Sequence, residues 1–353
     1  MNTPALEKFL RDNGVDLQGD LRVELISGGR SNLTFKAFDD VSAWVVRRPP
    51  TSGLTPSAHD MAREWAVTSA LGGTDVPVAR AVAFDPEGLV LGAPTTVVEY
   101  VGGTVIRTQD DLLALSDSDI EANTSELVQV LARLHAVDYD AVGLSGFGRP
   151  EGFVRRQVAT WARQWGSVQT RDLPDVERLR DALDAAVPAS SESSIVHGDF
   201  RVDNTILADG DPGTVAAVVD WEMSTLGDPL TDVALMCVYR QPIFDVVLGV
   251  NAAWTSDRYP SADSIAERYA RESGRDLPNW DFYLALANFK LAVIGEGITH
   301  RAIAGASSGP GAELAAEATQ EFIAAGLDAI GTRSRRFAST SYETAGGAPS
   351  YDR

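Results

Sequence analysis

"SSIVHGDFRVDNTIL", residues 193–207, decides the fold, because it places His, Gly, Asp and Asn between two apolar runs. Asp199 and Asn204 share the expected turn, and Asp220 follows the next apolar run, in "VAAVVDWEMSTLGDP" (215–229). If the run that follows Asn204 pairs as a hairpin with the run that precedes Asp220, Asp220 returns beside Asn204. A carboxylate and an amide oxygen suit Mg²⁺, which completes its coordination with waters and phosphates. Asn204 and Asp220 are therefore predicted metal ligands.

Asp199 would remain free to accept a proton from a hydroxyl group that attacks phosphorus. The spacing Asp-x-x-x-x-Asn, followed downstream by a metal-binding Asp, is the catalytic-loop pattern of protein kinases. Here the local sequences are "HGDFRVDN" and "DWE". Asp199 is the predicted catalytic residue. The alternative is a pair of surface turns in which Asp and Asn serve turn geometry alone.

A candidate phosphate-binding loop lies near the N-terminus, in "LISGGRSNLTFKAF" (25–38). Between two expected strands, Gly28 and Gly29 would let a loop cover nucleotide phosphates with backbone N–H groups. Ser31 and Asn32 would add side-chain donors. An ordinary hairpin turn is the alternative explanation of the two glycines.

The strand "SAWVVRRPP" (42–50) is expected to carry a cation that pairs with phosphate, and the helix "REWAVTSAL" (63–71) its carboxylate partner. Arg47 and Glu64 fill these two places. A guanidinium group is always charged and can bind phosphate oxygens in a bidentate way. Arg48 is the competing choice, since neighbouring strand residues face opposite ways, and Arg47 is preferred. The alternative is a surface cation on an edge strand.

The segment "TTVVEYVGG" (95–103) is expected to connect two lobes. An adenine ring there would pair with the backbone at Glu99 and Val101, and Val98 would shape the rear of the pocket. A plain strand-to-loop junction is the alternative.

The pattern along the chain predicts an α+β protein with two lobes. Residues 1–101 contain mainly short β-branched or aromatic runs and one helical segment, and form the predicted nucleotide-binding lobe. Residues 102–332 are mainly helical, with a short β insert at the opening stretch, and form the predicted catalytic and substrate lobe. One helix, "DFYLALANFKLAVIGEGI" (281–298), is apolar nearly all round and is expected to be buried. Residues 333–353 are polar and predict a flexible tail.

Composition excludes several classes of partner. The formal net charge of −20 repels nucleic acid and anionic membranes. No wholly apolar run of roughly 18 residues and no signal peptide were identified. The single cysteine, Cys237, rules out an internal disulfide. The expectation is a cytoplasmic protein with no nucleic-acid, membrane or obligate protein partner.

The five elements occur in the order found in one family. On "HGDFRVDN", "VVDWEMSTLGDPLTDVA", "GGRSNLTF", "WVVRRPP" and "VVEYVGGTVIR", the chain resembles the aminoglycoside phosphotransferase family, which has a protein-kinase-like two-lobed fold. The later "GLSGFGRPEGFVRRQVATWARQW" (143–165) resembles a branch related to the kinase-like domain joined to acyl-CoA dehydrogenases in animals. The resemblance covers about residues 20 to 300.

The resemblance implies ATP, or GTP in its place, together with Mg²⁺ as cofactors. Asp199 matches the family's catalytic aspartate, and Asn204 and Asp220 match its metal ligands. His197 matches a histidine that we expect to hold the catalytic loop. Arg47 is a departure, because many kinase-like folds carry lysine there, although this branch commonly has arginine.

The predicted function is transfer of the γ-phosphate of ATP to a hydroxyl group of a small molecule. The acceptor would be aminoglycoside-like or a hydroxylated metabolite, such as a hydroxyacyl-CoA. One alternative is a nucleotide-binding regulator without transfer activity, and another is a metal-dependent hydrolase that uses His197, Asp199 and Asp220. A further open choice concerns residues 153–165, whose arginines and tryptophans would either bind CoA or belong to an ordinary amphipathic helix: Arg155, Arg156, Trp161, Arg163 and Trp165.

Overall fold

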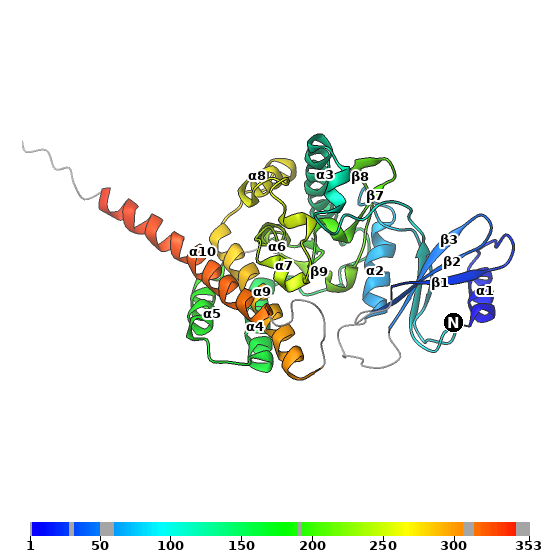
Figure 1. Cartoon of the computed structure of the whole chain (residues 1–353), viewed down its shortest axis with the longest axis horizontal. Helices are drawn as coiled ribbons and strands as arrows, with labels where there is room; N and C mark the ends of the chain where they lie inside the picture. Colours follow the sequence, from blue (N-terminus) through cyan, green and yellow to red (C-terminus); the bar gives the residue numbers. More distant parts are fainter. Residues whose placement is uncertain (1, 28–31, 50–59, 190–191, 306–313, 344–353) are drawn as a thin grey trace, which may run out of the picture. The chain divides into compact units, whose positions relative to one another are not determined.

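The computed structural model describes residues 2–27, 32–49, 60–189, 192–305 and 314–343, with side chains as far as residue 331 (Figure 1). The chain divides into two compact units. The first comprises Met1–Arg149 and Ser194–Leu226, and the second Pro150–Ser193 and Gly227–Arg353. The opening stretch therefore packs with the N-terminal part of the chain. The lobe boundaries after residues 101 and 332 stay predictions.

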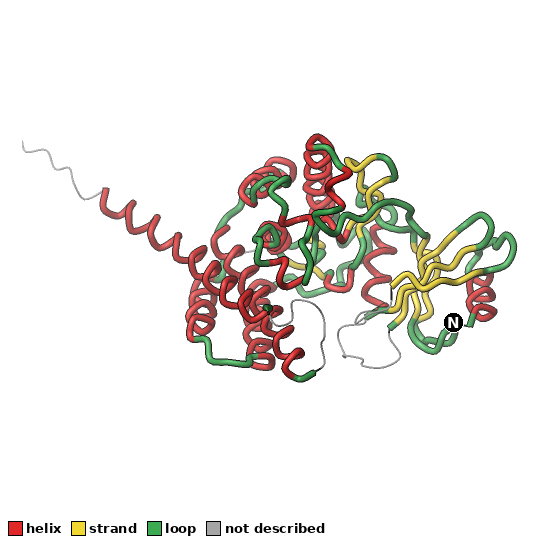
Figure 2. The backbone as a smooth tube through the Cα atoms, viewed as in Figure 1, coloured by secondary structure: helices red, strands yellow, loops and turns green. Residues whose placement is uncertain are grey.

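The first unit contains a five-stranded antiparallel sheet in the order β1-β2-β3-β5-β4 (Figure 2, yellow). Its strands are β1 (Arg22–Ser27), β2 (Leu33–Phe38), β3 (Ala43–Arg48), β4 (Ala81–Asp85) and β5 (Thr95–Glu99). Four of them, β1, β2, β3 and β5, coincide with short β-branched or aromatic runs that predict strands. The sequence also predicts a hairpin-like pair over residues 74–94, of which the structure forms only the strand β4. The helix α1 (Thr3–Asp12) covers one face and buries Leu6 and Leu10 against Trp44 and Val46.

Strand alternation assigns opposite faces to neighbouring residues of β3. Trp44 and Val46 belong to the buried cluster under α1, so Val45 and Arg47 face the other way. The helix α2 (Met61–Leu71) begins at Asp60, whose side chain accepts from the Arg63 N–H, and packs against β4 and β5. The strand cation and the helix carboxylate are thus carried by packed elements of the same unit.

The remaining part of the first unit is built around α3 (Asp117–Ala136). A capping box between Ser116 and Asp119 starts this helix. The helix packs against β6 (Ser194–Val196) and β8 (Asp211–Val218). β8 pairs with β7 (Thr205–Ala208), and β6 pairs with β9 (Thr225–Gly227). The β7–β8 pair is the hairpin expected between the run after Asn204 and the run before Asp220. The shorter helices of this unit are η1 (Asp111–Ala114), η2 (Val202–Asn204) and η3 (Trp221–Met223).

The second unit is helical. Its elements are α4 (Phe153–Val168), α5 (Pro174–Ala186), α6 (Leu230–Val238), α7 (Phe244–Leu248), η4 (Ala253–Thr255), α8 (Ala262–Ser273), α9 (Trp280–Ile303) and α10 (Ala315–Glu343). The helix α9 packs against α4, α5, α6, α7 and α10. By length and composition it could cross a membrane, a property that the search for wholly apolar runs missed, yet 72% of its apolar window is buried within the protein. The prediction of a buried core helix is confirmed.

The C-terminal helix reaches further than the sequence indicated. The backbone of α10 is helical to Glu343 and so includes much of the predicted tail, whose flexibility stays a prediction; residues 344–353 lie outside the described part. An antiparallel sheet with α1 and α2, followed by a mainly helical remainder, agrees with the predicted α+β class.

Candidate active site

The turn after β6 is shaped by Gly198 and fastened by His197. Gly198 has φ +84°, and a Cβ there would lie 2.7 Å from the Met223 carbonyl oxygen, so only glycine fits. Nε2 of His197 lies 3.0 Å from the Val219 carbonyl oxygen, and the Asp199 N–H lies 3.2 Å from Nδ1. These partners assign the proton to Nε2 and engage both ring nitrogens. His197 therefore ties the Asp199 turn to the strand end before Asp220 and has no ring nitrogen left for a metal.

Asn204 lies directly against Asp199. Its side-chain N–H group donates to the Asp199 backbone oxygen at 2.8 Å and to Oδ2 of the Asp199 carboxylate at 3.1 Å. Because the amide nitrogen faces Asp199, the amide oxygen is the atom that Asn204 would offer to a cation. The Val219 N–H donates to the Asn204 backbone oxygen at 2.9 Å, which brings Asp220 back beside this residue.

Asp220 has an unusual backbone and an unsatisfied side chain. Its φ of +66° is left-handed, a conformation that Asp tolerates better than most residues but that marks local strain. Its Oδ1 is buried and accepts no hydrogen bond from the described residues. A divalent cation would satisfy this oxygen, so Asp220 and Asn204 fit Mg²⁺ as ligands. Within the described ranges, no group of three or more His, Cys, Asp and Glu is placed to bind a metal, so waters and phosphates would complete the coordination.

Arg47, on β3, lies close to the carboxylates of both Glu64 and Asp220. Its Nη1 donates to Oε1 of Glu64 at 2.5 Å, and its Nη2 lies 3.7 Å from Oδ1 of Asp220. Burial raises the pKa of Glu64, against the attraction of Arg47, and the negative charge of Asp220 adds to the increase. Nε of Arg47 and Oε2 of Glu64 are buried and make no hydrogen bond to the described residues. The pair therefore retains donor capacity for an anionic ligand.

Arg48 points elsewhere. Its guanidinium donates to the Leu91 carbonyl oxygen at 2.7 Å and to the Pro49 carbonyl oxygen at 3.4 Å. The structure thus brings Arg47, and not Arg48, together with Glu64 and Asp220.

Arg201 is the residue that sequence reasoning missed. Its side chain is 14% exposed and lies 3.2 and 3.4 Å from the two carboxylate oxygens of Asp199, and 2.8 Å from Asp203. Burial raises the pKa of Asp203, and the attraction of Arg201 opposes that increase. The available signal was an arginine two residues after the catalytic candidate, in a turn too tight for its side chain to lie far away.

The connecting segment is fixed to the β7–β8 hairpin. Gly103 has φ +146°, and a Cβ there would lie 2.2 Å from the Leu207 carbonyl oxygen. The Thr104 N–H donates to that same oxygen at 2.9 Å, and the Leu207 N–H returns a hydrogen bond to Thr104 at 2.8 Å. Val101, just before the two glycines, is therefore held close to the strand that follows Asn204.

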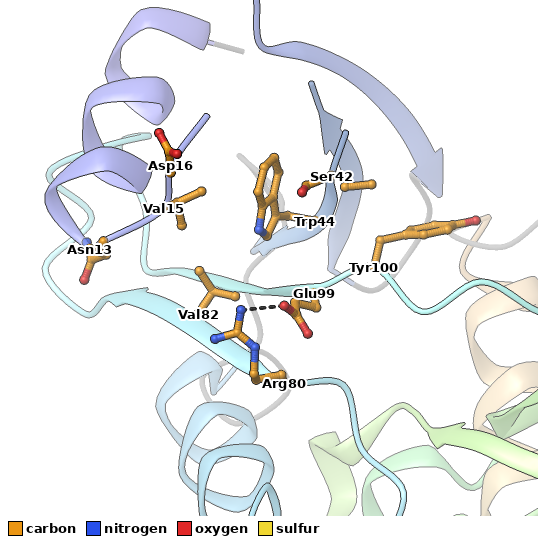
Figure 3. A pocket seen from close by; sticks show the side chains of 11 residues that line it. Asn13, Val15, Asp16, Ser42, Trp44, Arg80, Val82, Glu99 and Tyr100 are labelled. Atoms are coloured by element: carbon orange, nitrogen blue, oxygen red, sulfur yellow. Dashed lines mark hydrogen bonds and ion pairs between the residues drawn. The ribbon is translucent and has the colours of Figure 1, made fainter. Parts of the chain in front are cut away.

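Two of the predicted adenine contacts lie on opposite faces of β5. Val98 pairs with Val45 in the sheet, whereas Glu99 pairs with Trp44. The Glu99 carboxylate forms an ion pair with Arg80 and lines a 410 Å³ pocket on the α1 face (Figure 3). The Glu99 N–H already donates to the Arg80 carbonyl oxygen, so this N–H is not available to an adenine.

The predicted phosphate loop is only partly described. Asn32 is buried just before β2. Gly28, Gly29 and Ser31 lie outside the described residues.

The family follows from comparison with known proteins. The model of the APH family, the phosphotransferase enzyme family, matches residues 22–283. The chain belongs to this family. The match includes all five of the segments on which the resemblance was inferred, and it confirms that resemblance. At this level the protein is related to small-molecule kinases.

Relatives and solved structures agree with this assignment. Mouse acyl-CoA dehydrogenase family member 10 is 33% identical over 321 residues, which cover 90% of this chain and 30% of that protein. Human family member 11 is 31% identical over 334 residues, covering 92% of this chain and 43% of that protein. This phosphotransferase-family chain thus spans less than half the length of these curated relatives.

A crystal structure from Ralstonia eutropha, named as a candidate aminoglycoside phosphotransferase, superimposes with a TM-score of 0.81 at 32% identity, covering 94% of this chain and 98% of that one. Aminoglycoside phosphotransferase APH(4)-Ia, solved with AMP-PNP and hygromycin B, gives 0.60 at 18% identity, with coverage of 92% and 98%. The second likeness concerns the fold alone. Together they confirm the predicted protein-kinase-like fold.

Proposed function

We propose that the protein transfers the γ-phosphate of ATP to a hydroxyl group of a small molecule in the presence of Mg²⁺. The observation that carries the proposal is the arrangement around Asp199. Asn204 contacts it directly, the hairpin returns Asp220 beside Asn204, and Arg47 lies 3.7 Å from Asp220. A catalytic carboxylate, two oxygen ligands and a phosphate-binding cation are the parts that phosphoryl transfer requires. Solved relatives of this fold hold AMP-PNP or ADP, which supports a nucleotide as the donor.

In this mechanism Asp199 accepts the proton of the acceptor hydroxyl group as its oxygen forms a bond to the γ-phosphorus. The bond between that phosphorus and the bridging oxygen breaks, and ADP leaves with the electron pair. Mg²⁺, held by Asn204 and Asp220, would neutralise charge on the phosphates. Arg47 would bind phosphate oxygens while Glu64 orients its guanidinium. Arg201 would hold the Asp199 carboxylate in place.

The proposed acceptor is a hydroxylated metabolite, with a hydroxyacyl thioester as the first candidate. The support is that the named relatives join a segment similar to this one to a longer protein named for acyl-CoA. An aminoglycoside is the second candidate, because a neighbour of this fold was solved with hygromycin B. In α4, Trp161 and Trp165 are buried whereas Arg155 and Arg163 are exposed. This burial favours the amphipathic-helix interpretation over stacking of these tryptophans on a CoA adenine.

The test is Mg²⁺-dependent transfer of labelled γ-phosphate to a panel of hydroxyacyl-CoAs, aminoglycosides, sugars and amino alcohols. Asp199→Asn is the control, since it keeps the size of the side chain but removes the proton acceptor. A labelled product that the control loses would establish transfer and name the acceptor class. Tight ATP binding without any product would favour the regulator, and absence of ATP binding would refute the proposal. The cytoplasmic location and the absence of other partners stay predictions.

A further inference from the structure

Arg63, the residue before Glu64 in α2, makes contacts that the proposed chemistry does not use. Its Nη1 donates to the Ser224 carbonyl oxygen at 2.8 Å and to the Phe147 carbonyl oxygen at 3.1 Å. The guanidinium carbon also lies 4.7 Å from the centre of the Phe147 ring, which is cation–π geometry. One half-buried side chain therefore joins α2 to two segments that lie 84 and 161 positions further along the chain.

The segment reached through Ser224 carries the metal-ligand candidate. Ser224 directly follows η3, the short helix that begins after Asp220, and α2 packs against η3. The Ser224 hydroxyl group donates to the Val196 carbonyl oxygen at 2.8 Å, one residue before His197. A continuous path of hydrogen bonds thus runs from Arg63 to both segments that bear the catalytic aspartates.

The second attachment of α2 to the site is the ion pair of Glu64 with Arg47. Neighbouring residues on a helix point about 100° apart, so Glu64 faces β3 while Arg63 faces the loop after Asp220. A helix held at two such points cannot turn or slide without breaking one of them. We propose that Arg63 is a positioning residue, which locks α2 to the Asp220 loop and so keeps Arg47 and Asp220 at their working separation. This inference rests on the proposed function.

Arg48 supplies a matched control. It too is a half-buried arginine of the first unit whose guanidinium donates to two backbone carbonyl groups, those of Pro49 and Leu91. These two hydrogen bonds, both to described residues, involve neither α2 nor the loop after Asp220. Replacing either arginine by methionine removes a comparable guanidinium while keeping an unbranched side chain.

The experiment measures binding of AMP-PNP by calorimetry, with Mg²⁺ and with EDTA, to wild type, Arg63→Met, Arg63→Lys and Arg48→Met. Arg63→Met is expected to reduce the gain in affinity due to Mg²⁺ about 10-fold, the size seen when a residue supporting a metal ligand is lost. Binding in EDTA should change less than about twofold, Arg63→Lys should restore part of the gain, and Arg48→Met should behave as wild type. If Arg63→Met keeps the full gain, or Arg48→Met loses as much, the inference is wrong.

A nucleotide-free measurement covers the case in which Arg63→Met is unstable and separates the two proposals. Amide hydrogen exchange in Arg63→Lys should rise together in residues 61–71 and 221–225, whereas Arg48→Met should leave both segments protected. Independent exchange of the two segments would overturn the coupling. If wild type binds no AMP-PNP, the proposed function fails; if it binds and the Arg63 variants match wild type, only the inference about Arg63 fails.

Discussion

Glu64 and Glu296 are both buried and paired with an arginine, but they differ in how completely their carboxylate oxygens are hydrogen-bonded. In the second unit, Glu296 is fully buried and both of its oxygens are satisfied: Oε1 accepts from the Thr170 N–H and hydroxyl group, and Oε2 from Arg171. In the first unit, Glu64 accepts from Arg47 through Oε1, and its Oε2 has no hydrogen bond to the described residues. A fully bonded carboxylate fastens two segments, whereas a half-bonded one beside the unsatisfied Oδ1 of Asp220 is what the proposed ligand site requires.

The largest effect should come from removing the satisfied carboxylate. Glu296→Ala leaves the Thr170 donors and Arg171 without their partner, which should lower the free energy of unfolding by about 3 kcal/mol. Urea denaturation measures this loss. Binding of Mg²⁺-AMP-PNP by the folded variant should equal that of wild type, and a matching loss of nucleotide affinity would break the comparison.

Asp220→Asn should lose function and leave stability intact or improved. Asn accepts the left-handed backbone, and the change removes a buried carboxylate oxygen that has no hydrogen bond to the described residues, so the free energy of unfolding should rise by about 0.5 kcal/mol. The Mg²⁺-dependent part of AMP-PNP affinity should fall about 100-fold. Thermal melting and calorimetry measure the two effects. A variant that is less stable and still binds Mg²⁺ would show that Asp220 is structural.

Glu64→Gln sharpens the contrast between the two glutamates. The amide still accepts a hydrogen bond from Arg47 but loses the charge that orients the guanidinium, so affinity for Mg²⁺-AMP-PNP should fall about 10-fold. The matched change Glu296→Gln should leave this affinity unchanged and lower the urea midpoint. Equal effects of the two changes on nucleotide binding would remove the distinction.

The smallest effect concerns pH. Burial raises the pKa of Glu64 above its ordinary 4.5, so between the unfolded and folded values the folded state binds more protons. Stability should therefore fall as the pH rises from about 4.5 through the folded-state pKa, and Glu64→Gln should remove this component. Urea midpoints of the two proteins should converge below about pH 4.5 and separate by about pH 7, the variant being the more stable. Parallel profiles would mean that Glu64 ionises without cost.

The features that could be predicted from the sequence are those that depend on residues close together along the chain or on simple strand geometry. The Asp199–Asn204 spacing and the return of Asp220 follow from one hairpin, and strand alternation separates Arg47 from Arg48. The sequence places Arg201 near Asp199 but does not show that its guanidinium turns toward the carboxylate, because that direction depends on how the turn folds back. The helix α1 was missed because Leu6 and Leu10 form a stripe too short to stand out. The extent of α10 was missed because its last third is polar, and the contacts of Arg63 join segments remote in sequence.

The long apolar helix α9 has a consequence for folding of the chain during its synthesis. It leaves the ribosome before α10, the helix with which it packs most extensively. Until residues 315 onward emerge, a nascent chain presents 24 residues that satisfy the length and hydropathy of a membrane anchor. A chain truncated before α10 would lack the helix that packs most extensively against α9, and it should therefore expose that face of α9 and aggregate more readily than the full chain.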